Sequence, residues 1–246
     1  MNPCIHNAHL LLQKNSIGGL PIDAMAYIIA KGFEEGKIDS STWIVLPDEA
    51  KAEIFVDLLK FWYEQPNIAF HFPADEIDCF QGLSPSRHLP QQRLIALQKH
   101  YSEQPSIVVS SVFAAMHKTQ SPSCLKTITL YLQCSETYSP SDITLHLQNA
   151  GYTINQQMEE PGQYRHIGDT IHIWPIGEEF PIRLSFFDIE LEAIHQFSEK
   201  GKIELKSVTI LPAREMVLQK PALQKLSQRL IEFIRKHGYG RERRRY

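Results

Sequence analysis

The chain has 246 residues, of which 43% are hydrophobic and 22% are charged, an ordinary composition for a globular protein. Its formal net charge is −3, but residues 235–246 sum to +5, so the remaining residues sum to −8. Because the chain before this basic tail is acidic, we expect no general affinity for nucleic acid. The arginine-rich tail is then the one predicted nucleic-acid contact, although short charged tails are often simply solvated.

The first half of the chain alternates helix and strand patterns. Residues 20–36 have apolar residues at helical spacing, with Pro21 near the start and Gly36 past the end. The predicted helices are 20–36, 47–64, 88–101 and a short one at 112–118, and the predicted strands are 41–47, 67–72 and 106–111. Strands separated by helices predict an α/β domain, with a parallel sheet and helices on its faces.

The pattern changes around residues 119–124. Residues 126–133 alternate as a strand does, and residues 139–151 are typical of a helix with a serine at its start and Gly151 at its end. The strands predicted next are 163–167, 169–175, 180–187, 190–197 and 202–210, with turns at 177–179 and 198–201. These segments predict an α+β domain with an antiparallel sheet, followed by an amphipathic helix at 220–238.

We therefore predict an α/β domain over residues 1–123, an α+β domain over 124–212, and a C-terminal helix with a basic tail over 213–246. The four cysteines, Cys4, Cys79, Cys124 and Cys134, show no zinc or redox spacing and are expected to be free thiols. The N-terminus does not resemble a signal peptide, and no apolar run approaches the roughly 20 residues of a membrane span. We expect a soluble cytoplasmic protein.

An α/β domain calls for a search for a phosphate-binding loop before its first helix. Gly18 and Gly19 there permit a tight turn, but no Lys-Ser or Lys-Thr pair follows to reach phosphate and magnesium. Residues 34–39 contain Gly-Lys, but at the end of a predicted helix and without the flanking glycine pattern. We expect no nucleotide hydrolysis and no bound cofactor.

Other catalytic patterns are equally weak. His166, His172 and His195 fall in predicted strands, where three histidines can bind a metal but more often are half-exposed strand residues. No GxSxG motif is present, and the acidic pairs fall in predicted turns, where solvated charge is the usual state. We expect no metal site and no enzyme activity.

The segment FPIRLSFFD carries a candidate interface in its predicted strand. Alternation places three side chains on the core face: Ile182, Leu184 and Phe186. Arg183 and Phe187 then share the opposite face, and this pairing of arginine with an aromatic ring is enriched in interface hot spots. The alternative is that a second layer, a helix or a loop, covers Phe187.

Three segments resemble the N-terminal region of bacterial transcription-repair coupling factors (Mfd), which is itself similar to the excision-repair protein UvrB. They are SPSRHLPQQRLIAL at 84–97, the block from AGYTIN to LEAI at 150–194, and TILPARE at 209–215. The resemblance covers about residues 15–220. It implies that the first domain is a nucleotide-fold remnant with a degenerate phosphate loop, and that the second domain binds UvrA. In the coupling factor this second domain is masked until stalled RNA polymerase has been displaced.

The family's UvrA contacts carry over to two residues, Arg183 and Phe187. A third contact in the family is an arginine directly before a glycine, where this chain has Ile167-Gly168. Arg165 lies two residues earlier and points the same way in an unbroken strand, so we expect it to serve as the substitute.

Coupling factors continue into a polymerase-binding domain and a translocase, and this chain ends after one helix and its tail. Its MNPC start and RERRRY end favour a complete, short gene product. The first hypothesis is a non-catalytic module of excision repair that docks on UvrA, as an adaptor or as an inhibitor. The second is a scaffold that has lost UvrA binding and serves another partner, such as a separately encoded helicase. The third is an enzyme whose site is not recognisable.

Overall fold

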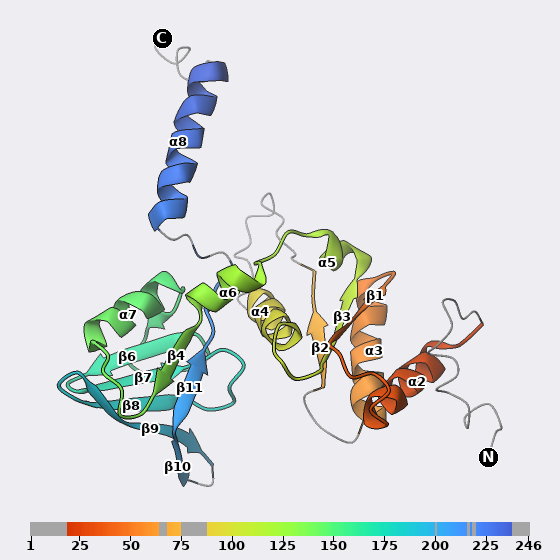
Figure 1. Ribbon diagram of the computed structural model, residues 1–246, viewed down its shortest axis with the longest axis horizontal. Helices are drawn as coiled ribbons and strands as arrows, with labels where there is room; N and C mark the ends of the chain where they lie inside the picture. Colours follow the sequence, from red (N-terminus) through yellow and green to blue (C-terminus); the bar gives the residue numbers. More distant parts are fainter. Residues whose placement is uncertain are drawn as a thin grey trace.

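The computed structural model describes residues 19–63, 68–74, 88–199, 201–215, 217 and 220–237. Figure 1 shows two lobes joined near α4 and α6, and a C-terminal helix, α8, that extends away from both. The first lobe combines helices with a parallel sheet, and the second lobe is built mainly on antiparallel strands. This confirms the predicted order of an α/β part, an α+β part and a terminal helix; the boundaries at 123 and 212 stay predictions.

The first lobe is a three-stranded parallel sheet in the order β1-β3-β2. The central strand is buried along its whole length, which explains its unbroken apolar sequence. Ile107 and Val109 face a cluster with α2 and α3, while Val108 faces the opposite cluster with α4. The strands are β1 (Thr42–Leu46), β2 (Ala69–Phe72) and β3 (Ile107–Ser111), and the helices are α2 (Ile22–Glu34), α3 (Glu49–Trp62), α4 (His88–His100) and α5 (Val112–Met116).

The second lobe contains a six-stranded sheet in the order β10-β9-β8-β7-β6-β5, and a two-stranded sheet of β11 and β4. Its pairs are antiparallel except for β5 with β6. The helices are α6 (Pro122–Ile128) and α7 (Pro140–Asn149). The strands are β4 (Leu130–Gln133), β5 (Thr153–Ile154), β6 (Gln163–Ile167), β7 (Thr170–Trp174), β8 (Ile182–Phe187), β9 (Glu190–Ser198), β10 (Gly201–Leu205) and β11 (Ser207–Ile210).

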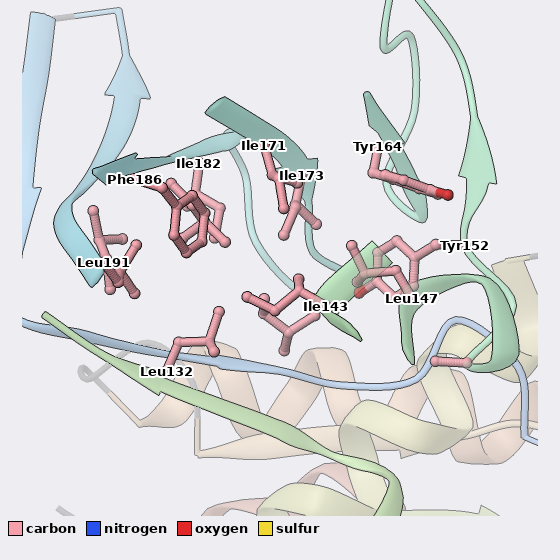
Figure 2. Close-up of a cluster of buried hydrophobic side chains, with 14 residues drawn as sticks. Leu132, Ile143, Leu147, Tyr152, Tyr164, Ile171, Ile173, Ile182, Phe186 and Leu191 are labelled. Atoms are coloured by element: carbon pink, nitrogen blue, oxygen red, sulfur yellow. The ribbon is translucent and has the colours of Figure 1, made fainter. Parts of the chain in front are cut away.

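One face of the six-stranded sheet forms the core of this lobe. Ile173, Ile182 and Phe186 point from the sheet toward Ile143 and Leu147 of α7, as Figure 2 shows. Leu132 of β4 lies in the same buried cluster. Because α7 and the β4–β11 pair lie on this face, the side chains of the opposite face are left to form the outer surface of the lobe.

Two predicted segments differ in the structure. Residues 126–133 were expected as one strand, but α6 extends to Ile128 and β4 begins only at Leu130. The Oγ atom of Ser121 accepts a hydrogen bond from the Cys124 amide, and a proline occupies the first turn. This capped start stabilises a helix here in spite of the strand preference of the β-branched residues. The predicted strand 202–210 divides at Lys206 into β10 and β11, which belong to different sheets.

A buried ion pair connects the two lobes. Arg93 of α4 is only 1% exposed, and its Nε and Nη2 atoms donate to the Glu215 carboxylate at 2.7 and 3.1 Å. Its Nη1 atom donates to the Pro73 carbonyl at 2.7 Å, and the guanidinium lies 4.0 Å from the centre of the Phe72 ring. Arg93 and Glu215 come from the first and last of the segments singled out in the sequence, so both segments meet at this junction.

The C-terminal helix α8 (Lys220–His237) is confirmed, but its apolar residues are not packed against the lobes. Leu230, Ile231 and Ile234 are each about half exposed. No described helix is long and apolar enough to cross a membrane. The candidate phosphate loop up to Gly18, Cys4, Cys79 and the tail after His237 lie outside the described residues.

Candidate protein-docking face

Strand β8 displays the predicted pair on the outer surface of the sheet. Its burial alternates along the whole strand: Ile182, Leu184 and Phe186 are buried, whereas Phe187 is 72% exposed. No helix or loop among the described residues covers the Phe187 ring. The alternative of a covering second layer is therefore wrong for the described part of the chain.

A bulge in β9 leaves this alternation intact. Ser185 pairs with Ala193 and Phe186 with Leu191, so the extra residue, Glu192, lies on β9 and not on β8. Phe187 therefore stays on the same face as Arg183. Had the extra residue been inserted in β8, Phe187 would have turned toward the core.

Two hairpin ends lie beside Phe187. The Phe186 amide donates to the Asp169 carbonyl at 2.9 Å, which holds the β6–β7 turn against the end of β8. Ile167 before that turn is 51% exposed, and Ile189 in the β8–β9 turn is 47% exposed. This end of the sheet therefore presents several apolar side chains to solvent, with Phe187 the most exposed of them.

Arg183 is half buried and has no ionic partner among the described residues. Its guanidinium carbon lies 5.9 Å from the centre of the Phe197 ring, and its Nε atom has no hydrogen-bond acceptor among the described residues. It stands about 13 Å along the strand from Phe187, the length of four residues. The charge of Arg183 is thus available to a partner that also contacts Phe187.

Arg165 lies on the same face, as strand alternation predicted. It pairs with His172 of β7, which pairs with Arg183 of β8, so two strand spacings of about 4.8 Å separate the arginines. Its Nη1 atom donates to the Gln156 carbonyl at 2.9 Å. Ile167 is two residues closer to Phe187 along β6, so Arg165 reaches the same face but not the same point. Its part in binding stays a prediction.

The histidines divide between the two faces. His166 points to the side opposite Arg165, whereas His172 and His195 stand on either side of Arg183. Burial and the neighbouring charges of Arg165 and Arg183 lower the pKa of His172. The described residues include no group of three acidic, histidine or cysteine side chains placed to hold a metal. The sequence analysis named His172 and His195 only as weak metal candidates, because their position beside Arg183 depends on the strand register.

Comparison with known proteins gives relatives for most of the chain. Residues 130–216 match the family model of the UvrB interaction domain. UvrABC system protein B of Mycoplasma pneumoniae is 28% identical over 178 residues, covering 71% of this chain and 26% of that protein. UvrABC system protein B of Methanosphaera stadtmanae is 30% identical over 179 residues, 71% of this chain and 26% of that protein.

A second group of relatives consists of transcription-repair-coupling factors. The transcription-repair-coupling factor of Escherichia coli is 27% identical over 148 residues, 59% of this chain and 13% of that protein. The chain therefore spans about a quarter or less of the length of these curated relatives. The matched interaction domain contains α7, the whole six-stranded sheet and every candidate docking residue.

Proposed function

Because the chain is similar to UvrB and to the N-terminal region of transcription-repair coupling factors, and carries a UvrB interaction domain, we propose that it is a non-catalytic interaction module of nucleotide excision repair. It docks on a UvrA-type ATPase through the outer face of its six-stranded sheet. The observation that carries this proposal is the exposed Phe187 ring on the same face as the unpaired Arg183.

The geometry favours a protein partner for this face. An exposed phenylalanine loses contact with water when a partner covers it, which contributes about 2 kcal/mol. Arg183 supplies charge-assisted hydrogen bonds from the same rigid strand, and its packing against Phe197 restricts the side chain before binding. Aromatic residues and arginine are among the residue types enriched at interface hot spots, and here both stand on one face of a rigid sheet.

Titration calorimetry of the full chain against purified UvrA tests the proposal. We expect binding that Phe187→Ala weakens by at least tenfold. Tyr131→Ala is the matched control, because Tyr131 is an aromatic residue 55% exposed in β4, outside the six-stranded sheet. Equal loss from both variants, or no binding by the wild-type chain, would refute docking through this face. The same preparation should show no ATP binding.

Ile167 favours a second candidate function, a scaffold that has lost UvrA binding and serves another partner. It stands where the resemblance calls for an arginine, and its exposed side chain makes this end of the sheet more apolar. Ile167→Arg distinguishes the two functions. Under the second function the wild-type chain does not bind UvrA and Ile167→Arg restores binding, whereas under the first function the wild-type chain already binds.

A further inference from the structure

Four basic side chains stand opposite one another across four adjacent strands. Arg165 of β6 pairs with His172 of β7, His172 with Arg183 of β8, and Arg183 with His195 of β9. We refer to these four residues as the basic row. Three strand spacings of about 4.8 Å give it a length of roughly 14 Å.

No carboxylate inside the basic row neutralises it. The Nε atoms of Arg165 and Arg183 and the Nδ1 atom of His195 have no hydrogen-bond partner among the described residues. The ring of Phe197 stacks on His172 at 6.4 Å and packs against Arg183, which fixes the middle of the row from one side. The basic row is therefore held in place without being paired to internal acids.

Charged groups on every neighbouring strand act on the two histidines. His172 faces Arg165 on β6 and Arg183 on β8, and its pKa is lowered first by burial and then by these arginines. Burial, Lys202 and Arg183 lower the pKa of His195, against the opposing effect of Glu204 on β10. Both histidines are thus neutral near pH 7 in the free protein.

We propose that the basic row is the docking site for a carboxylate-rich segment of the protein partner, which contacts His172 and His195 as well as the two arginines. This inference rests on the proposed function and adds the chemistry of the partner surface. A length of roughly 14 Å accommodates two or three carboxylates laid across the strands.

Acidic side chains around the basic row favour a short acidic segment over nucleic acid. Glu204 lies opposite His195 at one end of the row. Asp188 and Glu190 are exposed beside Phe187, at the end of the strands away from the row. A nucleic-acid backbone laid along the row continues past His195 and would meet the Glu204 carboxylate. A protein segment can turn away from the sheet at His195 and does not have to continue past Glu204.

Docking of carboxylates should be linked to proton uptake. A carboxylate placed beside His172 raises the pKa of its ring in the complex, while the pKa in the free protein stays low. The complex then holds more protons than the free partners, so affinity rises as pH falls from about 8 to about 6. One proton taken up corresponds to as much as tenfold in affinity per pH unit.

Calorimetric titration of the full chain with UvrA, in buffers of different ionisation enthalpy, measures this proton uptake. We expect uptake by the wild-type chain, and His172→Gln should reduce both the uptake and the dependence of affinity on pH. His166→Gln is the matched control, since His166 lies on the same hairpin but faces the other way. If UvrA binding requires Phe187 but takes up no protons, the inference about the basic row is overturned while the proposed function stands.

A second measurement does not require UvrA. An acidic Glu/Gly peptide and an oligothymidine of equal net charge are titrated into the full chain while the arginine Nε–H and histidine ring signals are followed by NMR. The peptide should shift the signals of Arg183 and His172, and the oligothymidine should leave them in place. The reverse result, or no shift with either probe, overturns the inference even where UvrA itself fails to bind.

Discussion

Replacing Arg93 by alanine should weaken the junction between the two lobes more than any surface substitution. The side chain is 1% exposed and makes three hydrogen bonds at 2.7, 2.7 and 3.1 Å. Truncation leaves the Pro73 carbonyl without its donor and the Glu215 carboxylate without its counter-charge. It also removes the guanidinium that packs on Phe72.

The expected loss in the free energy of unfolding is about 3 kcal/mol. Breaking a buried ion pair by removing one partner costs about 3–5 kcal/mol, because the other charge stays behind. The lower end applies here, since the Glu215 side chain is 18% exposed and keeps a hydrogen bond from the Thr119 hydroxyl. Replacing both partners, as Arg93→Met with Glu215→Met, should cost less than Arg93→Ala because no charge is left unpaired.

Urea unfolding followed by circular dichroism measures these differences, with Arg229→Ala as the control. Arg229 is exposed on α8 and should change stability by less than about 0.5 kcal/mol. A cost below about 1 kcal/mol for Arg93→Ala would contradict the reasoning, as would a double variant less stable than Arg93→Ala. Variants that stay folded should keep their affinity for UvrA, because the junction lies away from Phe187.

Three further outcomes are expected. Phe187→Ala should leave the free energy of unfolding nearly unchanged while weakening UvrA binding by about 2 kcal/mol, since the ring is already exposed in the free protein. Calorimetry should show that Arg165→Ala and Arg183→Ala each weaken UvrA binding by about 1–3 kcal/mol. If only Arg183→Ala weakens it, Arg165 does not replace the family arginine that is missing at Ile167. Gly151→Ala should reduce the free energy of unfolding by about 1–3 kcal/mol, seen as a lower thermal midpoint, because φ is +92° and the new Cβ would collide with Arg214 Cγ.

The strands that carry the docking face could be predicted because their patterns are local. Strand β8 alternates along its whole length, so the opposite faces of Phe186 and Phe187 follow from the sequence. The helix α6 was missed because Thr127 and Ile128 are typical of strands, and the Ser121 cap that decides the outcome lies several residues earlier.

The basic row and the lobe junction could not be predicted because both depend on contacts between distant residues. Arg93 and Glu215 are 122 residues apart in the chain, and nothing local to either one shows the ion pair. His172 and Arg183 become neighbours only once the register of β7 and β8 is known. Alternation fixes the face of a side chain, whereas its cross-strand neighbour depends on loop lengths and turn geometry.

The pairing of β4 with β11 has a consequence for protein engineering. Leu130, the first strand residue of the second lobe, pairs directly with Ile210, the last one, so the strands of this lobe begin and end at adjacent points. A segment with adjacent ends can be grafted into a surface loop of an unrelated host without stretching either chain. The second lobe should therefore be transferable as a cassette, carrying its outer face onto a scaffold of the experimenter's choice.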